Sequence, residues 1–174
     1  HLGRSRNDQV IAATRLWVRQ AVLDLIETMF ALSSTLGDLA ETHKSVLMPG
    51  YTHTRQAMPS SVGQLFGAYA EACARDVEAF WPALTMADRS ALGSASGYGV
   101  PLNLDRVKVA EGLHLSGVDV NTIYVQNTRG RLERMMLFGL HQCAQTISRL
   151  ANDMVWLTSE PFGFFELPEV LTTG

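Results

Sequence analysis

Apolar residues recur at helical spacing along three long segments, and this spacing restricts the fold more than any other feature of the sequence. Alternating steps of four and three place such residues in one seam along a helix. In the first segment the seam consists of Val18, Val22, Leu25, Met29, Leu32, Leu36 and Leu39. The same segment carries a second apolar set, Leu16, Leu23, Ile26 and Phe30. A helix that is apolar on two sides packs on two sides, as in the middle of a bundle.

A second helix is predicted after Pro59, over the apolar residues between Val62 and Phe80. Proline fits the first turn of a helix, where its missing N–H is not needed, so Pro59 is expected in that turn. Pro82 is expected to kink or end the helix.

The third helix has the clearest seam, and Asn127 or Thr128 is expected to be its N-cap. A shorter helix is expected to begin with Asp105 as its N-cap and to end near Gly112. The seam of the third helix consists of Met136, Leu140, Cys143, Ile147, Leu150, Met154 and Leu157.

Two loops are expected between these helices, at residues 47–61 and, rich in Gly and Ser, at residues 90–106. Strand-like alternation is not found. The sequence therefore predicts an all-α fold, a bundle of long antiparallel helices, in one domain of residues 1–174 that belongs to a longer chain. We expect partner subunits to complete the burial of the seams, because long two-faced helices often continue into a neighbour's bundle.

Composition excludes several classes of protein. Hydrophobic residues make up 47% of the chain and charged residues 18%, which is typical of a folded domain. The net charge of −3 gives no support for nucleic-acid binding. Apolar runs are too short for a membrane span. Cys73 and Cys143 lie far apart in helix-like segments, which favours reduced thiols and a cytoplasmic location.

The opening stretch, "HLGRSRNDQV", places Arg4, Ser5, Arg6 and Asn7 directly before the first helix. Helix N-termini present free N–H groups and attract anions, and arginine adds fork-shaped donors suited to carboxylate or phosphate. This pattern indicates an anion site. A capped helix start with solvated arginines would explain the same residues, and it remains an alternative interpretation.

The stretch "GYTHT" is the second candidate for a functional site. Gly50 permits an unusual turn, and Thr52 and His53 then stand on a loop between two helices. A histidine on such a loop can act as a general acid or base near neutral pH, although a structural role is the commoner one. The histidines lack the spacing of metal ligands, so no metal is expected. The glycine-rich loop lacks the spacing of a nucleotide site, so no other cofactor is expected either.

These residues carry a family resemblance. "GRSRNDQ" at residues 3–9 and "MPGYTH" at residues 48–53 resemble two signature segments of argininosuccinate lyase, a member of the fumarase/aspartase superfamily. "PLNLDR" and the final "ISRLANDMVWLTSEPFGFFELPEVLTTG" resemble later segments of the same family. The resemblance extends over the whole chain.

The resemblance implies a fold, an assembly and a reaction. The chain would be the central helical domain of a homotetramer, with active sites built from several subunits. The reaction would be the reversible cleavage of argininosuccinate, a dicarboxylate adduct, to arginine and fumarate in arginine biosynthesis. The family's mobile serine loop would begin about where this chain ends, so we expect the fragment alone to be inactive.

Site residues are implied by the same match. Asn7 and Thr52 correspond to substrate-binding residues, Arg6 lies in the same pocket with Arg4 and Ser5, and His53 corresponds to the histidine that assists proton transfer. The sequence departs from the family pattern at Leu2, at residues 54–58 and at residues 127–131, where Arg129 is kept but its acidic neighbours are not. A lyase with another amine leaving group and a silent, crystallin-like structural homologue therefore remain as alternatives.

Overall fold

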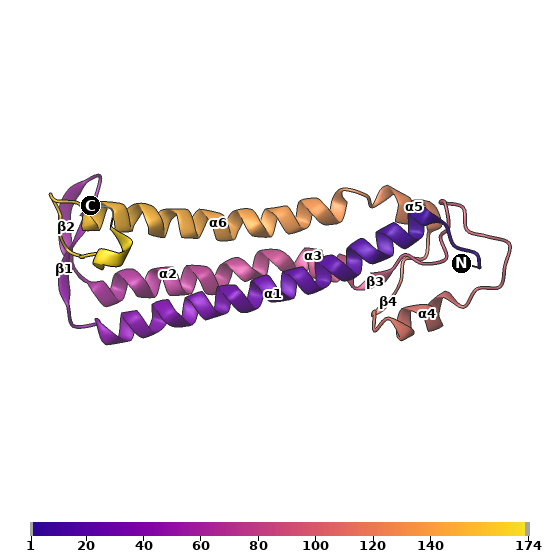
Figure 1. Cartoon of the computed structure of the whole chain (residues 1–174), viewed down its shortest axis with the longest axis horizontal. Helices are drawn as coiled ribbons and strands as arrows, with labels where there is room; N and C mark the ends of the chain where they lie inside the picture. Colours follow the sequence, from indigo (N-terminus) through magenta and orange to yellow (C-terminus); the bar gives the residue numbers. More distant parts are fainter. Residues whose placement is uncertain (1, 173–174) are drawn as a thin grey trace. The chain divides into compact units, whose positions relative to one another are not determined.

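The computed structural model describes residues 2–172, and most of them are helical (Figure 1). The predicted all-α class is confirmed. The helices are α1 (Arg6–Thr42), α2 (Val62–Asp76), α3 (Trp81–Ala87), α4 (Arg106–Gly112), α5 (Thr122–Asn127) and α6 (Arg131–Thr158), with two 3₁₀ turns, η1 (Val77–Phe80) and η2 (Glu169–Leu171). The predicted domain, residues 1–174, includes residues 1 and 173–174, which lie outside the described part.

Contacts divide the described chain into two compact units. Unit 1 contains residues 2–27 and 77–140, and unit 2 contains residues 28–76 and 141–172. Helices α1 and α6 are each divided between the two units, with the boundaries after residues 27 and 140. Unit 1 also holds a short parallel pair, β3 (Arg89–Ser90) with β4 (Gly117–Val118).

The core of unit 1 contains one close approach between a ring and a helix backbone. Phe80 is fully buried. A Cβ atom on Gly139 would lie 2.9 Å from Cγ of Phe80 and closer still to two other ring atoms. Only glycine at this position of α6 leaves room for the ring.

In unit 2 the start of α2 contacts the end of α1 through backbone hydrogen bonds. The N–H of Val62 donates to the carbonyl of Val46 at 2.9 Å, and the N–H of Gly63 donates to the carbonyl of His43 at 3.2 Å. Cys73 and Cys143 are both buried and free. Burial raises the pKa of both thiols, and the carboxylate of Asp76 raises it further.

The predicted loop at residues 47–61 is wrong, because this segment is a β-hairpin. Strand β1 (Leu47–Thr52) pairs antiparallel with β2 (Arg55–Ser61), with an irregularity between Pro49 and Tyr51. Neither strand has a fully buried residue, so no face of the hairpin imposes the alternation that identifies a strand in a sequence. Pro59 lies in β2 opposite Pro49, and not in a helical turn.

Two helix boundaries also differ from the predictions. The predicted helix over residues 62–80 ends at Asp76, and Pro82 lies in the first turn of α3 after a 3₁₀ turn. Asn127 ends α5 and Thr128 is its C-cap, so neither residue caps α6. The prediction for Asp105 is confirmed, since its carboxylate accepts from the N–H of Lys108 at 2.9 Å at the start of α4.

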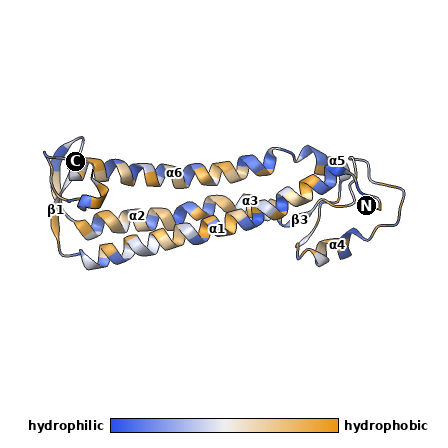
Figure 2. Ribbon diagram, viewed as in Figure 1, coloured by the Kyte–Doolittle hydropathy of each residue, from blue (hydrophilic) through white to orange (hydrophobic). Residues whose placement is uncertain are grey.

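Four residues of the α1 seam are buried within the single chain, which corrects the expectation that their burial needs a partner subunit, whereas Leu39 at the end of the seam is 37% exposed. Val18, Val22, Met29 and Leu36 are at most 5% exposed in the single chain. The second apolar face of the helix remains in solvent, with Leu23 at 44% and Phe30 at 50% exposure. Apolar residues recur along the whole of α1 and α6 (Figure 2).

Among residues 2–172, no helix combines the length and the apolarity that crossing a membrane requires.

Candidate active site

Helix α1 begins with a reciprocal cap. The Oγ of Ser5 accepts from the N–H of Asn7 at 3.2 Å, and the Oδ1 of Asp8 accepts from the N–H of Ser5 at 2.9 Å. This pair of bonds resembles a capping box, although Ser5 accepts from the second helical residue and not from the third, and it satisfies two N–H groups at the helix start. The helix start predicted from the sequence is therefore present, and the lone pairs of Ser5 are engaged by the backbone.

Asp8 connects this helix start to the glycine-rich loop. Its side chain is fully buried, and its Oδ2 accepts from the N–H groups of Gly93 and Ala95, both at 3.0 Å. Both loop residues have positive φ, 89° and 51°. Sequence reasoning missed Asp8, although the spacing of a serine followed three residues later by an acid was the available signal.

Arginine side chains gather around the same helix start. Arg6 is exposed and Arg4 is half-buried. Among the described residues, the Nη1 atom of Arg4 is buried without a hydrogen-bond partner. Burial lowers the pKa of Arg106, and the charge of Arg4 lowers it as well, while Asp119 and Asp8 act in the opposite direction. Positive charge from Arg4 and Arg106 therefore lies near the first turn of α1.

Asn7 contacts a residue that is 122 positions away in the sequence. Its Oδ1 accepts from Nη2 of Arg129 at 3.4 Å. Thr128, the neighbour of Arg129, is buried, and its hydroxyl accepts from Nη2 of Arg15 at 3.3 Å. The structure thus brings the 127–131 stretch, which departs from the family pattern, to the helix start that carries Asn7.

Thr52 and His53 lie at the tip of the hairpin in unit 2. Thr52 pairs with Arg55, which leaves His53 and Thr54 as a two-residue turn. Both turn residues have positive φ, 52° and 62°. This geometry matches the turns that fit the twist of a hairpin, but it is unfavourable for a β-branched residue such as Thr54. Gly50, expected to shape this turn, lies within β1 instead.

An aromatic cluster supports the hairpin. The ring of Tyr51 meets Phe162 edge-to-face at a centroid distance of 5.2 Å, and Trp156 meets the same Phe162 at 6.0 Å. A cavity of about 680 Å³ lies beside the cluster and is lined by residues of the hairpin, α2 and the end of α6. Asp153 on its wall accepts from the Tyr69 hydroxyl at 2.5 Å, and burial with this bond raises the pKa of Tyr69.

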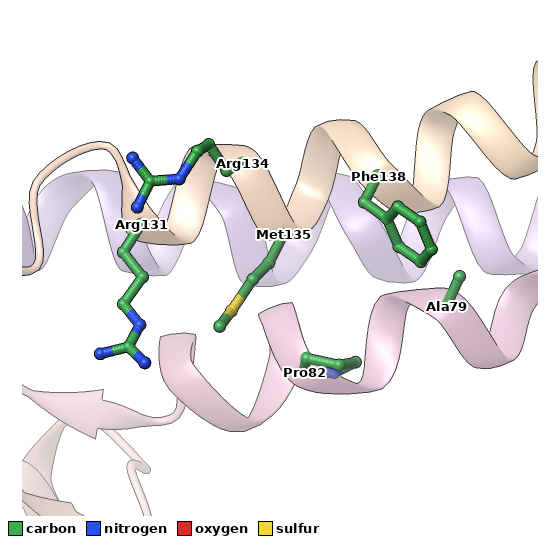
Figure 3. A pocket seen from close by; sticks show the side chains of 6 residues that line it. All are labelled: Ala79, Pro82, Arg131, Arg134, Met135 and Phe138. Atoms are coloured by element: carbon green, nitrogen blue, oxygen red, sulfur yellow. The ribbon is translucent and has the colours of Figure 1, made fainter.

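A smaller cavity in unit 1, about 280 Å³ in volume, holds none of the residues predicted for a site. Met135 and Phe138 of α6 face Ala79 and Pro82 across it (Figure 3). Arg131 and Arg134 complete its lining.

The predicted site residues thus fall into two groups. Arg4, Ser5, Arg6 and Asn7 surround the start of α1 in unit 1, whereas Thr52 and His53 form the hairpin tip in unit 2. Within the described part of the chain, no three His, Cys, Asp or Glu side chains form a group that could hold a metal ion. The first group can bind an anion, and the second offers a hydroxyl and an imidazole.

Comparisons with known proteins agree with the motifs. A family model described as "Lyase" matches residues 1–174. The argininosuccinate lyases of Parabacteroides distasonis and Bacteroides thetaiotaomicron are 41% and 44% identical over all of this chain, which spans 39% of either relative. A solved EDDS lyase in complex with formate is 25% identical, with a TM-score of 0.91 over 97% of this chain and 34% of its own. The resemblance inferred from the motifs is confirmed.

Proposed function

Because the chain belongs to this lyase family, we propose that it is part of a carbon–nitrogen lyase that cleaves argininosuccinate reversibly to arginine and fumarate. The observation that supports this most is the donor cluster at the start of α1, in a chain whose relatives are argininosuccinate lyases. The helical domain of residues 1–174 would then contribute one part of a longer enzyme.

The donor cluster would hold a substrate carboxylate. The reaction begins when a base removes a proton from the carbon next to a carboxylate, and the resulting carbanion spreads its charge into that carboxylate. Fixed donors bind this group more strongly as its charge grows, which lowers the barrier. Arg4, Arg6 and Asn7 supply such donors, and the hydroxyl hydrogen of Ser5 is available in addition, because its oxygen serves as the acceptor of the helix cap.

Thr52 and His53 would act at the other end of the reaction. The C–N bond breaks as the guanidinium leaves with a proton, and His53 would assist this acid step while Thr52 binds substrate. An imidazole suits the role because its charge changes near neutral pH. Exposure at a hairpin tip makes both side chains accessible to a bound substrate.

We also propose a cytoplasmic homotetramer whose active sites combine residues of several subunits. The exposed apolar face of α1 supports an assembly, because contiguous apolar surface in water marks an interaction site. Two free buried cysteines are in keeping with a reducing compartment.

A lyase with a different amine leaving group is the second candidate function. It is favoured by the likeness to an EDDS lyase, which shows that the fold is used for another substrate. The departures at residues 54–58 and 127–131 lie at the hairpin and beside Asn7, where they would affect substrate choice.

A steady-state assay of the full-length protein separates these functions. Fumarate absorbance is followed with argininosuccinate and with EDDS as alternative substrates. We expect release of fumarate with a kcat/KM at least tenfold higher for argininosuccinate. Preference for EDDS would establish the second function, and no fumarate from either substrate would indicate a structural homologue.

A further inference from the structure

The side-chain amide of Asn7 contacts a guanidinium. Its Oδ1 accepts from Nη2 of Arg129 at 3.4 Å. An asparagine side chain has one acceptor oxygen and one NH₂ group with two donors. When a guanidinium engages the oxygen, the NH₂ group is the part of the amide that remains to meet an anion. A reversed amide would instead present its oxygen to a carboxylate, and the two would repel each other.

The backbone beside Arg129 is anchored by buried neighbours. The hydroxyl of Thr128 donates to the carbonyl of Val125 at 2.6 Å and accepts from Arg15. Arg15 is 1% exposed and forms an ion pair with Asp119 at 2.7 Å.

The backbone after Arg129 is fixed as well. Gly130 adopts a φ of 76°, and the N–H of Arg131 donates to the carbonyl of Thr128 at 2.9 Å as α6 begins. The segment between α5 and α6 therefore sets where the exposed guanidinium of Arg129 can reach.

We propose that Arg129 is a positioning residue, which keeps the NH₂ group of Asn7 directed toward a substrate carboxylate. This inference rests on the proposed function, because it assumes that Asn7 binds a dicarboxylate. It assigns to Arg129 an effect that passes through Asn7, and so it differs from a direct contact with substrate. The two effects separate in a double-mutant cycle, since an indirect effect disappears when Asn7 is removed.

The test uses the full-length protein and measures fumarate binding by isothermal titration calorimetry, together with KM and kcat for argininosuccinate. Arg129→Met, Asn7→Ala and the double variant are compared, with Arg134→Met as the matched control. Arg134 is another exposed arginine of the same region, one turn into α6. Arg129→Lys is added, because an ammonium can still donate to Oδ1 of Asn7.

We expect Arg129→Met to weaken fumarate binding and to raise KM by about three- to tenfold, the range for one hydrogen bond, with kcat nearly unchanged. Arg129→Lys should recover part of the loss, and Arg134→Met should match the parent. In the Asn7→Ala background Arg129→Met should change binding by less than about twofold.

An equal loss with and without Asn7 would overturn the inference, because Arg129 would then act on the ligand directly. No loss in Arg129→Met would also overturn it. A parent that binds fumarate but does not cleave argininosuccinate would contradict the proposed function alone, and the binding data would still decide the role of Arg129. A parent that binds no fumarate would contradict both.

Discussion

Asp8 belongs to the stretch that we propose to bind an anion, yet its own side chain is a buried acceptor. Its carboxylate receives the N–H groups of Ser5, Gly93 and Ala95. In the proposed site the residues before Asp8 would donate to a ligand, while Asp8 itself fixes the loop at Gly93 and Ala95. Motif recognition identified the whole stretch, but only the structure separates the residue that holds the fold from those that face outward.

Replacing Asp8 with Ala should destabilise the full-length protein. Two loop N–H groups and one helix cap lose their acceptor, and each buried unsatisfied group costs about 1–3 kcal/mol. We expect the free energy of unfolding to fall by about 2–4 kcal/mol, measured by urea denaturation at equal protein concentration. Asp38→Ala, at an exposed position of the same helix, is the control. Equal stability of the two variants would contradict the role of Asp8.

At the scale of elements, helix spacing was predictable and the hairpin was not. The four-three repeat identifies α1 and α6 because each carries an apolar seam with a period that only a helix satisfies. The hairpin has no such seam, and the chemistry of its turn, His53–Thr54, is not that of the usual Asn-Gly or Asp-Gly pairs. Thr128 was misplaced because a capping residue fits the end of α5 as well as the start of α6.

Gly139 provides a direct test of the packing between α6 and Phe80. Alanine normally stabilises a helix, but here its Cβ would overlap a buried ring. We expect Gly139→Ala to lower the free energy of unfolding by about 1–3 kcal/mol through overpacking. Gly37→Ala in α1 is the matched control, since a Cβ there meets nothing within 4 Å. It should raise stability by about 0.5–1 kcal/mol. Stabilisation by both changes would show that the ring can move aside.

At the scale of the whole molecule, the exposed apolar faces are the feature that a single chain does not explain. On α1 they include Leu23 and Phe30, and on α6 they include Leu137, Phe138, Ile147, Val155 and Trp156. In α1 most of the seam predicted to meet partner subunits is already buried, so the second face of that helix is left for assembly, whereas in α6 the seam residue Ile147 is itself exposed. Two-faced helices were predictable from the sequence, whereas the assignment of each face required the structure.

We therefore expect the full-length protein to sediment as a tetramer at micromolar concentration. Phe30→Asp should shift it toward smaller species, because a carboxylate placed in an apolar interface loses its hydration. Thr35→Asp, at an exposed polar position of the same helix, should leave the tetramer intact. A parent protein that sediments as a monomer would rule out this assembly and the composite sites with it.

We propose that His53 moves a proton while the α1 cluster binds the carboxylate, and steady-state kinetics of His53→Asn in the full-length protein tests these roles most directly. His114→Asn is a close control, because both histidines are exposed and have a φ of 52°, which asparagine tolerates. Loss of acid–base assistance should lower kcat by about 10²–10⁴-fold and leave KM within a few-fold of the parent. The control should keep parental rates. A kcat for His53→Asn within about threefold of the parent, less than ~1 kcal/mol of barrier, would show that His53 is structural and would contradict the account.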